Sequence, residues 1–297
     1  MLPVMSPTTR GDRPQDPEHS RRNGAGQHED AHRQQGERLQ QGERLQKVLA
    51  TLGLGSRRSI EEWIRDGRIR VNDVVAQLGT RVVPADRVTV DGTPVALQSG
   101  PAAEPVATVV LGYHKPVGEV TTRHDPQGRP TVFERLPPPP AGRWIVVGRL
   151  DVNTSGLLLF TTDGELAHRL MHPSSEVERE YLVRVRSQPT PATLESLRRG
   201  VELEDGWARF DRIEAENATD GHAWFRVVLH EGRNREVRRL WRAVGHEVSR
   251  LMRLRYGPVS LPRDLRPGES RLLPPELVQA LRRVSGSAAG AGQHPAV

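Results

Sequence analysis

The chain has 297 residues, and its 43 lysine and arginine residues outnumber 37 aspartate and glutamate residues, which gives a formal net charge of +6 and a pI of about 10.5. This balance favours a polyanionic partner. The absence of cysteine excludes disulfides, thiolate catalysis and cysteine zinc sites. No apolar stretch reaches membrane-spanning length and the first residues lack a signal peptide's apolar core, so we expect a soluble, cytoplasmic protein with no membrane partner.

Both ends of the chain are expected to be disordered. Residues 1–42 are rich in Gly, Pro, Gln, His and charge, and they contain almost nothing apolar to bury. The string QGERLQ occurs twice, at Gln35–Gln40 and Gln41–Gln46, and only the second copy continues into an apolar pattern. Residues 285–297, SGSAAGAGQHPAV, have a similarly loose composition.

Residues 43–98 are predicted to form a small module of two helices followed by a sheet. Apolar residues recur at helical spacing from Leu45 to Leu52, Ser56 can cap a second helix that Gly67 ends, and short β-type segments follow. This order resembles the S4-like RNA-binding module of a small-subunit ribosomal protein and many RNA-modifying enzymes. Taken singly, its charges also fit solvated helix faces. The resemblance implies phosphate contacts from Lys47, Arg57, Arg58 and Arg68.

Residues 99–105 are expected to be a linker, because they are small, contain proline and lack periodicity. From 106 to 284, strand-like runs alternate with three helical candidates, at residues 164–171, 190–200 and 235–245. Strands outnumber helices and many connections are short. The predicted class of this second domain is therefore α+β, with a central mixed or antiparallel sheet.

The run GRLDVNTSGLLLFTTDG, from Gly148 to Gly164, is the most informative feature of the chain. Two runs of buried-strand length, WIVV and GLLLFT, flank a polar stretch of turn-forming residues. Asp151 is therefore predicted to lie on a loop that the sheet holds at both ends. On local grounds alone, Arg149 and Asp151 also fit loop residues that make only nearby hydrogen bonds.

The full string GRLDxxTxGLLLxTxDG resembles the catalytic motif of the pseudouridine synthases that modify ribosomal RNA, in the family containing small subunit synthase A and large subunit synthases B, E and F. Tyr113–Thr122, His172–Val185 and Glu231–Leu261 match as well. Together these segments cover most of residues 107–273. The resemblance implies a central sheet with the active cleft across one face. The sequences of these segments are most similar to those of members that act on the large subunit.

Pseudouridine formation breaks the bond from ribose to uracil nitrogen, turns the base and joins the ribose to carbon. The reaction needs no redox change or energy input, so we expect no cofactor. It does need a carboxylate, a base to remove the proton on carbon and a pocket for an extruded nucleotide. By resemblance Asp151 is the catalytic carboxylate, and the sequence leaves open whether it attacks the sugar or the base.

A guanidinium beside Asp151 would keep that carboxylate ionised in a dry pocket. The resemblance gives this role to Arg238, in the GRNREVRRL segment, with Arg239 as the alternative. Arg238 also fits an ordinary surface arginine on its predicted helix. The same stretch, residues 233–255, holds eight arginines against two glutamates, and we expect Arg233 and Arg235 to bind RNA.

Three further residues are assigned to the RNA by the same resemblance. Tyr181, in REYLV, would stack on the target uracil and its hydroxyl would assist proton removal, although it also fits a half-buried strand aromatic. Arg149 would fill the space that the flipped base leaves. Leu254 would pack against the base, with Leu251 as the less favoured choice because it fits plain core.

A metal site is not expected. His168 and His172 have the spacing of a helical chelating pair, but no glutamate follows His168 directly and no third ligand is evident.

The predicted function is that of a pseudouridine synthase acting on a uridine of large-subunit rRNA. We expect a monomer whose partner is ribosomal RNA. A relative acting on small-subunit rRNA is the alternative within the family. A non-catalytic rRNA-binding assembly factor is the alternative outside it, and the intact GRLD argues against this because pure binding does not need Asp151. A membrane-surface protein lacks an amphipathic anchor.

Overall fold

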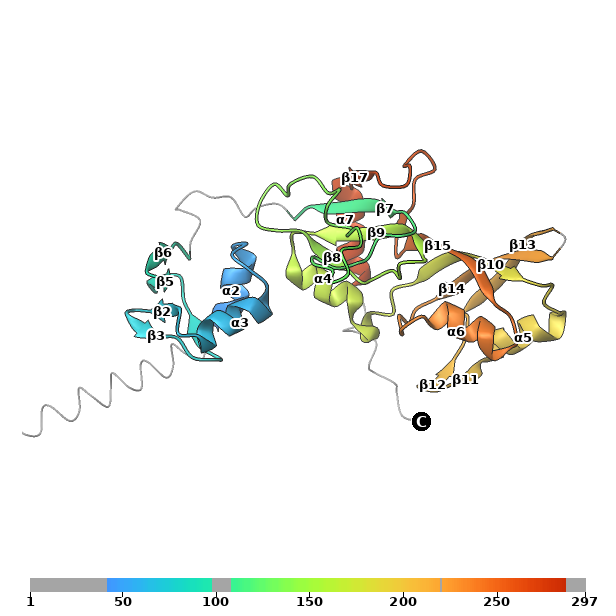
Figure 1. Cartoon of the computed structure of the whole chain (residues 1–297), viewed down its shortest axis with the longest axis horizontal. Helices are drawn as coiled ribbons and strands as arrows, with labels where there is room; N and C mark the ends of the chain where they lie inside the picture. The colour runs from blue at the N-terminus through green and yellow to red at the C-terminus, as the bar shows by residue number, and fades with distance from the viewer. Residues whose placement is uncertain (1–41, 98–107, 220, 287–297) are drawn as a thin grey trace, which may run out of the picture. The chain divides into compact units, whose positions relative to one another are not determined.

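The computed structural model describes residues 42–97, 108–219 and 221–286. The chain divides into two compact units, at residues 1–102 and 103–297 (Figure 1). The predicted linker at 99–105 and nearly all of the two predicted tails lie outside the described residues. At their inner edges, Gly42 is buried and Ser285 closes the last helix.

The first unit has the predicted order of two helices and a small sheet. Helix α3 is capped as expected, because the Ser56 Oγ accepts a hydrogen bond from the Ser59 amide at 3.0 Å. The helices bury Leu45, Leu49 and Ile60 against the sheet. Strands β3, β2, β5 and β6 form one antiparallel sheet in that order, and β1 pairs with β4. The elements are β1 (Glu43–Arg44), α2 (Leu45–Thr51), α3 (Arg57–Arg65), β2 (Ile69–Val71), β3 (Val74–Val75), β4 (Arg81–Val82), β5 (Val88–Val90) and β6 (Thr93–Val95).

The second unit is built on a mixed sheet of nine strands, as the α+β prediction requires. Its main path runs β13-β14-β10-β15-β9-β7-β17, with β8 paired to β9 and β16 to β15. Every pairing is antiparallel except that of β15 with β9. The strands are β7 (Val110–Lys115), β8 (Ile145–Val147), β9 (Ser155–Thr161), β10 (Arg179–Arg186), β11 (Val201–Leu203), β12 (Gly206–Ala208), β13 (Arg212–Thr219), β14 (His222–Leu229), β15 (Val248–Tyr256), β16 (Val259–Ser260) and β17 (Ser270–Leu272).

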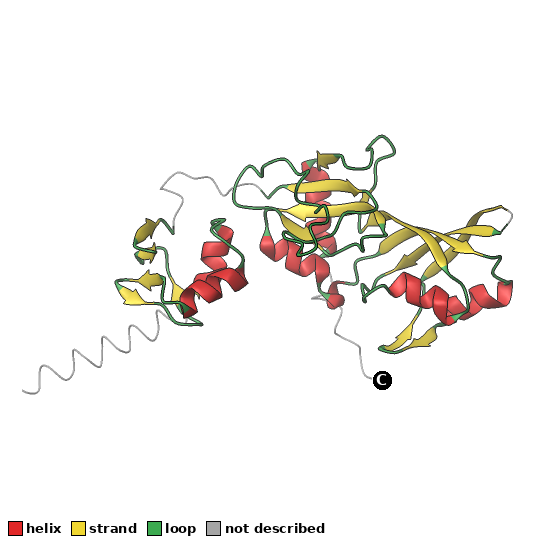
Figure 2. Ribbon diagram, viewed as in Figure 1, coloured by secondary structure: helices red, strands yellow, loops and turns green. Residues whose placement is uncertain are grey.

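Helices cover the two halves of this sheet separately (Figures 1 and 2). Leu166 of α4 and Leu281 of α7 share a core with Leu157 and Leu159 of β9. Leu240 and Trp241 of α6 belong to a second core, together with residues of β10 and β14. The three predicted helices are present, and α7 was not predicted. The helices are α4 (Gly164–Met171), the short 3-10 helix η1 (Pro173–Ser175), α5 (Pro191–Arg199), α6 (Glu236–Ala243) and α7 (Pro275–Val284).

The parallel contact between β9 and β15 brings the GRLD segment to the arginine-rich segment. Its register pairs Ser155 with Met252 and Gly156 with Arg253. A Cβ atom on Gly156 would lie 2.2 Å from the carbonyl oxygen of Arg253, and the backbone φ of Gly156 is +107°. Only glycine permits so close an approach with that backbone conformation.

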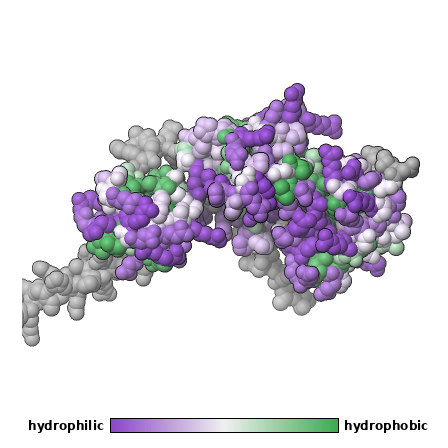
Figure 3. Space-filling model, in the orientation of Figure 1, coloured by the Kyte–Doolittle hydropathy of each residue, from purple (hydrophilic) through white to green (hydrophobic). Residues whose placement is uncertain are grey.

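No helix within residues 42–97, 108–219 and 221–286 is both long and apolar enough to cross a membrane. Hydrophilic side chains predominate on the face shown in Figure 3, and hydrophobic ones gather only in small patches.

Candidate active site

Asp151 lies on the loop between β8 and β9, as predicted, and the preceding segment holds that loop by backbone contacts. The amide of Gly118 donates to the Val152 carbonyl at 2.8 Å, and the Thr121 hydroxyl donates to the Leu150 carbonyl at 2.9 Å. Within the loop, the Thr154 amide donates to the Asp151 carbonyl at 3.0 Å. Because bonds on both sides of Asp151 fix the backbone, the carboxylate is placed in advance of any ligand.

Arg235, and not Arg238, makes the ion pair with Asp151. An Arg235 terminal nitrogen lies 3.1 Å from a carboxylate oxygen of Asp151, and the side chains are 42% and 31% exposed. Arg235 precedes the first turn of α6 with a left-handed backbone, φ 50°, which turns its side chain toward the loop. At this exposure, water screens much of the attraction.

Arg238 binds the same loop through its backbone. Its guanidinium donates to the Asn153 carbonyl at 2.9 Å and to the Val248 carbonyl at 3.0 Å. Burial lowers the pKa of Arg238, the neighbouring Arg235 lowers it further, and Asp151 opposes both effects. Arg238 therefore lies in the field of Asp151 without a direct ion pair, which corrects the predicted pairing. The other candidate, Arg239, pairs with Asp205 at 2.8 and 2.9 Å.

Lys115 is a site residue that the sequence did not single out. It is fully buried at the end of β7, and its ammonium donates to the carbonyls of Thr154 and Pro116 at 2.8 and 2.9 Å. Burial lowers its pKa to about 8, against the opposing effects of Glu119 and Asp151. The sequence offered two signals: its rarity, since 41 of the 43 basic residues are arginine, and its place in the matching segment Tyr113–Thr122.

A cavity of about 1120 Å³ opens over Asp151. Tyr181 of β10 lines it and is 9% exposed, and Arg149 lines it from the loop. Leu251 also lines the cavity, whereas Leu254 does not, which corrects the predicted preference. The physical reason is local strand geometry, because Leu251 is paired with Val183 of β10, whereas the register shift between Glu180 and Tyr181 leaves Leu254 without a partner on β10.

Two buried arginines lie beneath this cavity. Arg179 is 8% exposed and Arg253 is 2% exposed, and each guanidinium lies 5.1 Å from the ring centre of Tyr256. Arg253 donates to the Leu157 carbonyl at 2.7 Å, and Arg179 donates to the carbonyls of Val177, His230 and Glu231. Neither makes a carboxylate ion pair within the described part of the chain. Their charge favours an anionic or electron-rich occupant of the cavity.

Comparisons with known proteins agree with this geometry. The profile of the family described as RNA pseudouridylate synthase matches residues 109–243, and that of the S4 domain matches residues 43–88. The ribosomal large subunit pseudouridine synthase B of Escherichia coli K12 is 57% identical over 222 residues, which are 74% of this chain and 75% of that protein. The chain belongs to the RNA pseudouridylate synthase family. The resemblance seen in the sequence is thereby confirmed.

Other family members extend the comparison. The synthase B of Xylella fastidiosa strain Temecula1 is 58% identical over 241 residues, which are 80% of this chain but 50% of that protein. This chain thus spans about half the length of that relative. A solved structure titled "Crystal structure of pseudouridylate synthase" superposes with a TM-score of 0.55 at 26% identity, covering 80% of this chain and 99% of that one.

In this family member, Arg233 is held mainly by neighbouring protein groups. Its guanidinium pairs with Glu231 and donates to the carbonyls of Gly206 and Trp207. Its amide donates to the buried carboxyl group of Glu236 at 3.2 Å. Burial is the main cause that raises the pKa of Glu236 to about 7.

The four basic residues predicted to meet phosphates in the S4 domain all lie in the first unit. Arg57 and Arg58 are exposed on α3. Lys47 pairs with Glu43 at 3.0 Å, and Arg68 pairs with Asp91 through two hydrogen bonds of 2.9 and 2.5 Å.

The two histidines with helical chelating spacing make local contacts at the end of α4. His172 follows α4, and its Nδ1 lies 2.7 Å from the Ser174 hydroxyl and accepts from the Ser174 amide. The rings of His168 and His172 are 5.8 Å apart.

Proposed function

We propose that the protein is a pseudouridine synthase that isomerises a uridine of large-subunit rRNA. The observation that carries this proposal is the constellation over the sheet: Asp151 fixed on its loop at the edge of a cavity of about 1120 Å³, with Tyr181 on the wall. The family membership of the chain supports it. The relatives named above as large subunit synthases support the choice of RNA.

The cavity has the properties that the reaction needs. A uridine extruded from the RNA would enter it with its ribose near Asp151, whose carboxylate acts on the ribose or the base as the bond to nitrogen breaks. The backbone bonds of the loop and the donors of Lys115 and Arg238 to its carbonyls hold the loop that carries the carboxylate. Positioning of this kind accounts for a large part of the rate enhancement in enzymes that use no cofactor.

Tyr181 and Leu251 would hold the base once it leaves the RNA. Both line the cavity, one from β10 and the other from the neighbouring β15. The tyrosine ring would stack on the uracil, and its hydroxyl would assist removal of the proton from carbon after the new bond forms. Arg149 is exposed at the rim, where its guanidinium plane would replace the extruded base in the RNA stack.

The S4 domain would supply affinity for the rRNA through its basic side chains. Arg57 and Arg58 are exposed, and Lys47 and Arg68 would exchange their carboxylate partners for phosphates. We further propose that the enzyme acts as a monomer in the cytoplasm and needs neither metal nor cofactor.

The test is to map pseudouridines in rRNA by carbodiimide modification in a strain that lacks the gene. The strain is complemented with the wild-type gene or with Asp151→Asn. Loss of a large-subunit pseudouridine that only the wild type restores would support the proposal. Loss of a pseudouridine from small-subunit rRNA would instead indicate that the enzyme acts on that RNA. A complete set of pseudouridines would favour a non-catalytic rRNA-binding protein.

A further inference from the structure

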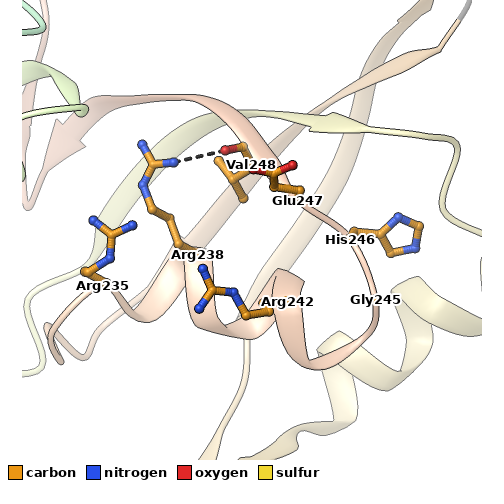
Figure 4. A pocket seen from close by; sticks show the side chains of 7 residues that line it. All are labelled: Arg235, Arg238, Arg242, Gly245, His246, Glu247 and Val248. Atoms are coloured by element: carbon orange, nitrogen blue, oxygen red, sulfur yellow. Dashed lines mark hydrogen bonds between the residues drawn. The ribbon is translucent and has the colours of Figure 1, made fainter.

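The arginines of helix α6, and Arg235 directly before it, differ in their surroundings. On one side Arg239 is neutralised by the bidentate contact with Asp205. On the other side Arg235, Arg238 and Arg242 line a second cavity, of about 290 Å³, which His246 and its neighbours close. Figure 4 shows the three arginine side chains next to one another, with Arg238 reaching the Val248 carbonyl.

The carboxylates near this second cavity are already engaged. Asp151 is paired with Arg235, and Glu247, which lines the cavity, is paired with Arg186 at 2.9 Å. Arg238 is bound only by carbonyl groups, and its buried Nε has no hydrogen-bond partner. Arg242 is exposed, and its side chain makes neither a hydrogen bond nor an ion pair within the described ranges. The second cavity therefore has an excess of positive charge.

The second cavity adjoins the site of the proposed reaction, because Arg235 lines both cavities. From Arg235 to Arg242 the guanidiniums extend over about two helical turns, or roughly 10 Å. A stacked nucleic acid strand carries about three phosphates over that length. A strand that places one nucleotide over Asp151 would thus reach the second cavity with its next phosphates.

We propose that Arg238, Arg242 and His246 form a groove that holds the phosphodiester backbone of the RNA strand beside the extruded uridine. This inference rests on the proposed function, since the RNA occupies the neighbouring cavity. The His246 ring is held by a 2.8 Å contact between its Nδ1 and the Ser187 hydroxyl, and it lies edge-on to Trp241. Guanidiniums attract phosphate oxygens, and the carbonyls of Asn153 and Val248 hold that of Arg238 in place.

Arg242 is the residue that tests the groove, because removing it breaks no described contact. We would measure the Kd of Arg242→Gln for large-subunit rRNA purified from the deletion strain, by filter binding at several salt concentrations. Loss of one phosphate contact to a single strand should reduce the steepness of log K against log salt by about 0.7. This corresponds to a roughly fivefold higher Kd at 0.1 M salt. KM in the isomerisation assay should rise by the same factor, with the loss falling on KM and not on kcat.

The matched control is Arg199→Gln, which removes the same charge from α5. Arg199 is 73% exposed, its ion pair with Glu195 spans 3.7 Å, and it lies in neither cavity. The groove predicts a weaker Kd and a smaller salt slope for Arg242→Gln but not for Arg199→Gln. Equal values for the two variants and the wild type would overturn it.

The groove and the proposed function fail in different ways. If the wild-type protein forms pseudouridine and Arg242→Gln binds RNA normally, the groove is wrong and the activity stands. If the wild-type protein forms none but Arg242→Gln alone loses RNA affinity, the groove stands as an RNA-binding surface and the proposed activity is wrong. Arg242→Glu provides a second variant, for which the groove predicts a larger loss of affinity than for Arg242→Gln.

Discussion

Replacement of Gly156 by alanine should destabilise the second unit severely. The new Cβ would lie 2.2 Å from the Arg253 carbonyl oxygen and 2.5 Å from its amide nitrogen, and both are backbone atoms of the paired strand β15. A side chain cannot rotate away from backbone, so β9 and β15 would have to separate. The φ of +107° adds strain of about 1–3 kcal/mol for a non-glycine residue.

We expect a loss of more than about 4 kcal/mol in the free energy of unfolding, because both the strain and the broken pairing contribute. For a unit of this size, each 1 kcal/mol shifts the Tm by roughly 2–4 °C. Gly156→Ala should therefore lower the Tm by more than about 8 °C, or prevent folding, as measured by tryptophan fluorescence during heating.

Gly206→Ala provides the control for the backbone strain alone. Gly206 has a similar φ of +101°, but a Cβ there would meet no atom within 4 Å. This variant should lose only about 1–3 kcal/mol. If Gly156→Ala is no less stable than Gly206→Ala, the close approach of β9 and β15 does not shape the site as we describe.

Three further variants test the neighbours of Asp151. Arg238→Met removes the donor to the carbonyl of Val248, a buried residue, and the donor to the exposed carbonyl of Asn153. We expect a loss of about 1–3 kcal/mol in urea unfolding and a lower kcat, and wild-type values in both would exclude the positioning role. The pKa of Glu236, raised to about 7 in the folded state, means that the folded protein binds more protons than the unfolded chain between about pH 4.5 and pH 7. The contribution of this group to the free energy of unfolding therefore falls by about 3 kcal/mol as the pH rises through that window. Glu236→Gln should remove this part of the pH dependence. Parallel curves of unfolding free energy against pH for the two proteins would contradict the prediction. Tyr181→Phe should retain RNA affinity and lose kcat, and an unchanged rate would exclude the hydroxyl from the chemistry.

The elements that carry the proposed chemistry could be predicted where the sequence pattern was local. The turn-forming residues between two apolar runs placed Asp151 on its loop, and the alternation around Tyr181 placed it on a strand. The helix of the arginine-rich segment followed from its apolar periodicity. In each case a few adjacent residues determine the local structure, so no knowledge of the rest of the fold was needed.

The pairing within the site could not be predicted, because it depends on backbone geometry and register. Arg235 pairs with Asp151 and itself has a left-handed backbone conformation, which no sequence pattern predicts for an arginine. Leu251 is paired with β10 and Leu254 lies at a register shift of that pairing, and β15 itself was not recognised as a strand. Lys115 donates to the carbonyl of Thr154, which is distant in sequence, so its contact with the Asp151 loop is seen only in the folded structure.

The most direct test of the central claim is tritium release from rRNA labelled at carbon 5 of its uridines. Joining the ribose to that carbon displaces the tritium into water, so release counts pseudouridines as they form. The purified wild-type protein should release tritium from large-subunit rRNA of the deletion strain, and Asp151→Asn, which keeps the shape of the side chain without its charge, should release none. Equal release by the two proteins would contradict the catalytic role of Asp151.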